Sequence, residues 1–155
     1  MATSSVLRMR KQYTGIPTGK PNPALPSAIS WTPYLRVRVS ANHQNTPSLP
    51  AVVDSGAPFC LFRADVADFL HLDLKKCPTG ELGGIIGGPK DTVYFHRVNL
   101  IIENNWTISV VAGFMRKLGT QAILGRVGFF DLFDIKFDHS VTPPELEINK
   151  RDLVN

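Results

Sequence analysis

The chain has 155 residues, of which 43 % are apolar and 19 % charged, so it suits one globular domain and excludes a disordered chain or a coiled coil. No apolar run reaches the roughly 18 residues of a membrane helix, so we expect neither a membrane protein nor a secreted one. The net charge of +4 is uneven, because residues 1–53 carry six bases and no acid. Since no groove-like pattern of aromatic and basic residues accompanies these bases, we expect no nucleic-acid partner.

The cysteines and histidines argue against a disulfide scaffold and against a metal site. Only Cys60 and Cys77 are present, and neither lies in a zinc-binding spacing. The four histidines form no H-E-x-x-H pattern. We therefore expect a protein of a reducing compartment, the cytoplasm, with no metal or other cofactor.

Residues 1–30 differ in composition from the rest of the chain. They are rich in Gly, Pro, Ser and Thr, and prolines at positions 17, 21, 23 and 26 interrupt any regular element. This composition predicts an irregular or extended basic leader over residues 1–30, with the folded domain over residues 31–155.

The domain reads as a series of short strands. Residues 34–40 alternate apolar and polar side chains, as expected of a strand buried on one face. The further predicted strands are residues 49–53, 59–62, 92–102, 107–111, 134–138 and 145–149, with a loop at 42–50 and a turn at 103–105. Amphipathic spacing predicts short helices at 63–70 and 127–133. The fold class is therefore all-β, a closed barrel with one or two short helices.

One segment carries the most chemical information. Residues 51–57, A-V-V-D-S-G-A, bring the Asp54 carboxylate to the end of an apolar strand. Gly56 permits a tight turn or a close approach by another backbone, and Ser55 can hydrogen-bond nearby main chain. Taken alone, the segment also fits a solvated Asx-type turn.

A second motif changes the interpretation of the first. Residues 122–126, A-I-L-G-R, form another apolar strand that ends in glycine. Together the two motifs resemble the retropepsin family of aspartic proteases, and the resemblance extends over about residues 34–138. It implies a retropepsin-like closed β-barrel in which the second strand packs beside the aspartate loop. The resemblance assigns catalysis to Asp54, Ser55 and Gly56, and substrate contact to Ala57 and Ile123.

A glycine-rich segment lies where the family places its flap, a hairpin that closes over substrate. This segment is G-G-I-I-G-G-P at residues 83–89. The residues expected to contact substrate are Gly83, Gly84, Ile85, Ile86 and Gly87. As a lone feature it also fits an ordinary loose turn. A phosphate loop is set aside because Pro89 stands where that motif needs lysine, and a strand follows.

Two positions depart from the family pattern. Ser55 replaces the commoner threonine. Retroviral members have an acid shortly after the aspartate motif that pairs with the arginine of the second motif, whereas this chain has Pro58 and Phe59. The partner of Arg126 is therefore open, with Asp131 and Asp134 as candidates.

The single D-S-G motif bears on the mechanism. Aspartic proteolysis needs two carboxylates that share one proton. The resemblance therefore implies a homodimer in which each copy supplies Asp54, with a peptide or protein as substrate. Two alternatives stay open: a catalytically silent dimerisation or peptide-binding module of the same fold, and a basic β-barrel that binds nucleic acid through residues 1–30.

Overall fold

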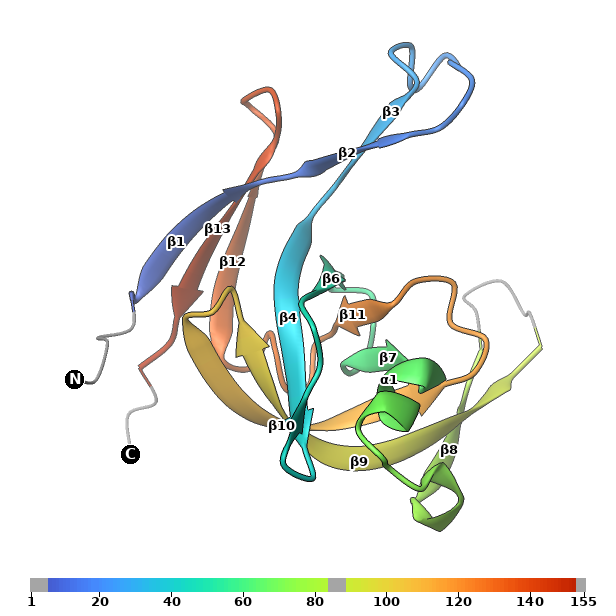
Figure 1. The fold of residues 1–155 in the computed structure, drawn as a ribbon. Coiled ribbons are helices and arrows are strands. Elements are labelled where there is room, and N and C mark those ends of the chain that lie inside the picture. Colours follow the sequence, from blue (N-terminus) through green and yellow to red (C-terminus); the bar gives the residue numbers. More distant parts are fainter. Residues whose placement is uncertain (1–5, 84–88, 153–155) are drawn as a thin grey trace.

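Eight strands form one curved sheet in the computed structural model, which describes residues 6–83 and 89–152 (Figure 1). In order across the sheet they are β5 (Gln44–Asn45), β4 (Tyr34–Ala41), β6 (Leu49–Val53), β11 (Ala122–Leu124), β7 (Leu61–Arg63), β10 (Trp106–Met115), β9 (Asp91–Ile102) and β8 (Thr79–Leu82). β4 also pairs with β9, with Val37 opposite Ile102, so the six strands from β4 to β9 close a ring. The predicted all-β closed barrel is confirmed.

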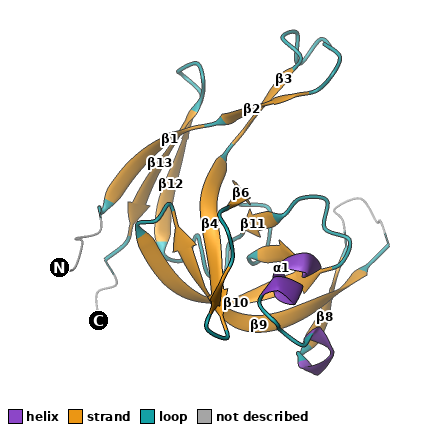
Figure 2. Cartoon of the chain, viewed as in Figure 1, coloured by secondary structure: helices purple, strands orange, loops and turns teal. Residues whose placement is uncertain are grey.

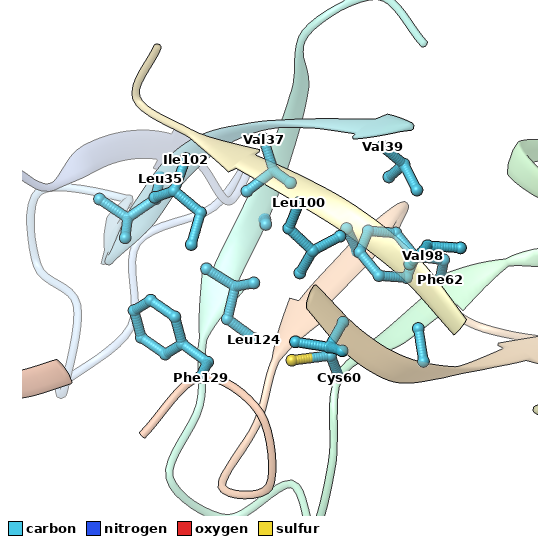
Figure 3. Packing of buried hydrophobic residues seen from close by; sticks show 14 of the residues in the cluster. Leu35, Val37, Val39, Cys60, Phe62, Val98, Leu100, Ile102, Leu124 and Phe129 are labelled. Atoms are coloured by element: carbon cyan, nitrogen blue, oxygen red, sulfur yellow. The ribbon is translucent and has the colours of Figure 1, made fainter. Parts of the chain in front are cut away.

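The barrel interior is filled by one face of each long strand. In β4, Leu35, Val37 and Val39 are fully buried, while the residues between them face outward. Leu100 and Ile102 of β9 pack into the same core (Figure 3). β9 and β10 form the predicted hairpin, whose turn follows Ile102. The alternation in the sequence therefore locates the core-facing side chains correctly.

The helical content is small (Figure 2). Helix α1 (Ala64–Phe69) lies within the predicted range 63–70, and a 3-10 turn, η1, covers Leu74–Lys76. Neither element has the length and apolar character that a membrane span needs, and the described residues contain no other helix.

The helix predicted at residues 127–133 is wrong. The segment is a series of turns, because Gly128 has a positive φ of 98°, which a right-handed helix does not allow. The Asp131 N–H donates to the Arg126 carbonyl five residues earlier, not to the fourth as in an α-helix. Phe129 and Phe133 are both fully buried and stack at 5.0 Å. The apolar spacing thus reflects a turn packed on the core.

The predicted leader is extended over residues 8–17, where it forms two paired strands in place of irregular chain. β1 (Arg8–Gln12) pairs with β13 (Glu145–Lys150), which pairs in turn with β12 (Phe133–Asp138) in a three-stranded sheet. β2 (Thr14–Pro17) pairs with β3 (Ile29–Thr32). Ion pairs join the charged side chains of β1 to β13, because Glu147 of β13 accepts from Arg8 at 2.6 Å and from Arg10 at 3.1 Å. The domain boundary near residue 31 stays a prediction.

Candidate active site

Two parallel strands bring the two sequence motifs together. β6 and β11 are neighbours in the barrel, with Val53 opposite Leu124. Because they run in the same direction, both end at one edge of the sheet, and Asp54 and Gly125 follow there side by side. The Asp54 N–H donates to the Leu124 carbonyl at 3.0 Å, which fixes the main chain of the acid to the second motif.

The loop after β6 orients the Asp54 carboxylate. Oδ1 of Asp54 accepts a hydrogen bond from the Gly56 N–H at 2.8 Å. The Asp54 carbonyl accepts from the Ala57 N–H at 3.2 Å, which closes a tight turn. Asp54 is half-buried, and Ser55 and Gly56 are exposed. The carboxylate is therefore held by the main chain at a surface that solvent and ligands reach.

Gly125 is the point where the aspartate loop crosses the second motif. A Cβ at this position would collide with the Phe59 carbonyl group and would lie 2.9 Å from the Ala57 carbonyl oxygen. The next two N–H groups, of Arg126 and Val127, donate to the Ala57 and Pro58 carbonyls at 2.9 and 3.0 Å. Only glycine permits this close approach of the two backbones.

Arg126 binds main-chain carbonyl groups. Its Nη1 donates to the Ser55 carbonyl at 3.0 Å and to the Gly56 carbonyl at 3.1 Å. The two candidate partners from the sequence are wrong, because their carboxylates have other contacts. Asp131 accepts from the Gly128 N–H at 3.1 Å, and Asp134 pairs with Arg151 at 2.6 Å.

A cleft of about 490 Å³ opens beside Asp54. Five of the residues that the sequence assigned to the site line it: Asp54, Gly56, Ala57, Gly83 and Ile123. Ser55 is not among the lining residues, and its carbonyl instead holds Arg126. The predicted flap residues Gly84, Ile85, Ile86 and Gly87 lie outside the described residues, so the flap stays a prediction.

The rest of the cleft wall is mostly apolar. The additional lining residues are Pro58, Leu61, Leu82, Pro89, Asp91, Met115, Lys117 and Leu118. Leu61, Val93 and Met115 form a small buried cluster of their own, separate from the main core. Phe59 packs against this cluster and meets Phe95 edge to face at 5.1 Å. The acid therefore stands beside a preformed apolar wall.

A solved structure has a similar fold. Over 92 % of its length, the chain superposes on 98 % of a retropepsin-like aspartic protease from Rickettsia conorii, with a TM-score of 0.56 and 13 % sequence identity. The chain has a retropepsin-like fold. A second match, at a TM-score of 0.40 and 17 % identity, is the retroviral protease-like domain of Ddi1 from Leishmania major, over 60 % of this chain and 72 % of that one. No protein-family model matches the chain, and no curated protein matches it.

The retropepsin-like cleft contains a second acid, Asp91, which no sequence motif indicated. Asp91 begins β9, and its Oδ1 accepts from the Thr92 N–H at 2.9 Å. Its Oδ2 is buried and has no hydrogen-bond partner among the described residues. Lys117 lines the same cleft. Asp54 and Asp91 are thus the acids of the cleft wall, and only Asp54 belongs to the strand-end loop that Gly125 and Arg126 hold.

Other reactive groups near the retropepsin-like site are less suited to chemistry. Cys60 is fully buried, and burial raises the pKa of its thiol to about 11, so it is not a thiolate near neutral pH. Within residues 6–83 and 89–152, no three His, Cys, Asp or Glu side chains gather in a way that could hold a metal ion. The cleft wall therefore holds two carboxylates, and that of Asp54 is the one that the main chain of the strand-end loop orients.

Proposed function

We propose that the protein is an aspartic endopeptidase that acts as a homodimer and hydrolyses peptide bonds with a water molecule held between two Asp54 carboxylates. One observation carries the proposal: Asp54 is fixed at the end of β6 by the Leu124 carbonyl and the Gly56 N–H, beside an apolar cleft. The retropepsin-like fold supports the same conclusion.

The need for a second copy follows from the chemistry. Two carboxylates must share one proton, so that one acts as base and the other as acid. The D-S-G motif occurs once in the chain. A two-fold axis beside Asp54 would supply the second carboxylate from an identical loop, and such an interface is isologous.

The reaction then proceeds by general acid–base catalysis. The charged carboxylate accepts a proton from water, whose oxygen bonds to the peptide carbonyl carbon, while the protonated carboxyl group gives its proton to the carbonyl oxygen. Collapse of the tetrahedral intermediate breaks the C–N bond. The leaving nitrogen takes the proton that came from water, and the hydroxyl proton returns to the other carboxylate. The pair again holds one proton.

The cleft supports an extended peptide as substrate. β8 is the last strand of the eight-stranded sheet, and Leu82, at its end, lines the cleft. An extended peptide can form main-chain hydrogen bonds with such an edge. Leu61, Met115 and Leu118 offer apolar contacts to a large apolar side chain next to the scissile bond. Both cysteines are free, which suits the cytoplasm as the site of action.

A peptide-library digestion tests the proposal. Purified wild-type protein, Asp54→Asn and the control Asp68→Asn are incubated with a mixed peptide library, and new termini are counted by mass spectrometry. Asp68 is an exposed acid of α1, away from the cleft lining. We expect cleavage by wild type and Asp68→Asn, and none by folded Asp54→Asn. Peptide binding without cleavage would support the silent binding module instead.

A further inference from the structure

Residues 14–32 form an arm that stands apart from both larger sheets. β2 and β3 pair only with each other among the described strands, with Thr14 opposite Thr32 and Pro17 opposite Ile29. Figure 1 shows this ribbon and its connecting loop projecting away from the barrel. We call residues 14–32 the arm.

The arm leaves the barrel at the edge that carries Asp54. β4 follows β3 directly and runs antiparallel to β6, with Tyr34 opposite Val52. The Val53 N–H, one residue before Asp54, donates to the Pro33 carbonyl at 2.9 Å. The start of β4 and the end of β6 therefore lie together, and the arm extends outward from that point.

Both ends of the arm are anchored. Pro33 holds one end against Val53. At the other end, buried Tyr13 donates its N–H to the Pro144 carbonyl at 2.8 Å, and its hydroxyl lies 3.1 Å from Nε2 of His139. Because its root is fixed on two sides, the arm has a defined direction.

Most of the arm has no surface of this chain to pack on, and Trp31 of β3 is the residue that packs against the main core. All four residues of β2 are exposed, and those of β3 are only half-buried. Ile16 of β2 is an apolar side chain with 38 % of its surface exposed. A two-stranded ribbon is at best marginally stable in water, and its outer edges offer unpaired main-chain groups. A groove of about 470 Å³, lined by Thr14, Ile16, Tyr34 and Pro50 among others, separates the arm from the barrel.

We propose that the arm docks on a second copy of this chain and clasps the dimer at the Asp54 edge. The position of that copy rests on the proposed function, which brings two Asp54 loops together across a two-fold axis. An arm rooted at this edge is within reach of a partner that meets the chain there, and the two-fold symmetry would double the contact. Val127 supports the same face as an interface, because it pairs with the Asp54 loop at Phe59 and is 60 % exposed.

Sedimentation of matched variants tests the arm. Ile16→Asp places a charge on the arm, where Ile16 is 38 % exposed, and Val111→Asp places one at a comparable apolar position of β10 on the barrel, which is 45 % exposed. We expect Ile16→Asp to raise the dimer dissociation constant by about tenfold or more and Val111→Asp to leave it near the wild-type value. Equal dissociation constants for Ile16→Asp and wild type would overturn the arm proposal while leaving the dimeric protease intact.

Hydrogen exchange of the wild-type protein provides a test that needs no variant. As the protein concentration rises through dimerisation, the amides of residues 14–17 and 29–32 should gain protection, and those of residues 107–111 should not. Dimerisation without added protection in the arm would overturn the proposal. A wild-type protein that cleaves peptides as a monomer would instead overturn the proposed dimeric site, and the arm proposal with it.

Discussion

Arg126 Nη1 donates a hydrogen bond to the Ser55 carbonyl oxygen at 3.0 Å, and the same nitrogen reaches the Gly56 carbonyl at 3.1 Å. The arginine that follows β11 thus holds the loop that follows β6. A charged donor on two carbonyl groups restricts the main chain next to Asp54, as the proposed catalytic role of that loop requires. Because Arg126 binds main-chain carbonyl groups, it does not need an acidic partner at positions 58 and 59, where this chain has Pro58 and Phe59.

Removal of this contact should affect activity more than stability. Arg126→Met deletes both hydrogen bonds at an exposed position, so we expect a loss of about 1 kcal/mol or less in the free energy of unfolding. Peptide cleavage should fall by on the order of tenfold or more, because the Asp54 loop is less restricted. Arg116→Met, at another exposed arginine, is the control. Equal cleavage rates for the two variants would contradict the role given to Arg126.

Gly125 should be the least replaceable glycine of the site. A methyl group there would collide with the Phe59 carbonyl, so Gly125→Ala forces the two strand-end loops apart. We expect a loss of about 3 kcal/mol or more in the free energy of unfolding, measured by urea denaturation. Gly119→Ala is the matched control, because a Cβ at that position would meet nothing within 4 Å. A Gly125→Ala protein as stable as the control would show that the loops do not cross as described.

The pairing of β1 with β13 should depend on pH. The hydrogen bond from Arg8 lowers the pKa of Glu147 below its ordinary value of 4.5. A carboxylate with a lowered folded-state pKa adds stability above its unfolded pKa, and this contribution is lost as pH falls through the folded value. Glu147→Gln should therefore be slightly less stable than wild type at pH 7, and the difference should shrink in acid below about pH 4. Urea denaturation of both proteins at neutral and at acidic pH measures this difference in the free energy of unfolding. A difference that does not change with pH would contradict this ion pairing.

The sequence predicts those parts of the fold whose signal is local. Alternation in residues 34–40 marks a strand buried on one face, residues 92–102 form a long strand-like run, and the structure confirms both strands. The motifs that contain Asp54 and Gly125 each describe a strand end, so they are visible without knowledge of the neighbours. The partner of Arg126 cannot be predicted from the sequence, because every residue has a main-chain carbonyl group and none is marked by its side chain.

The remaining features depend on contacts between distant segments. β1 has few apolar residues, so its sequence shows no alternation of apolar and polar side chains. Its partner strand contributes Glu147, which lies 137 positions along the chain from Arg10. The apolar wall of the cleft combines Leu82, Met115 and Leu118, which belong to separate segments brought together only in the folded chain. At residues 127–133 the apolar spacing fits both a helix and a turn that packs on the core. The positive φ of Gly128 decides in favour of the turn.

A mixing experiment tests most directly whether each active site needs two Asp54 side chains. The wild-type concentration is held constant while Asp54→Asn protein is added in increasing excess, and peptide cleavage is followed. The dimeric site predicts that the rate falls toward zero, because wild-type chains become trapped in mixed dimers with one competent carboxylate. Asp68→Asn protein, added in the same amounts, should raise the rate instead. A cleavage rate that is unchanged by excess Asp54→Asn protein would show that each chain acts alone.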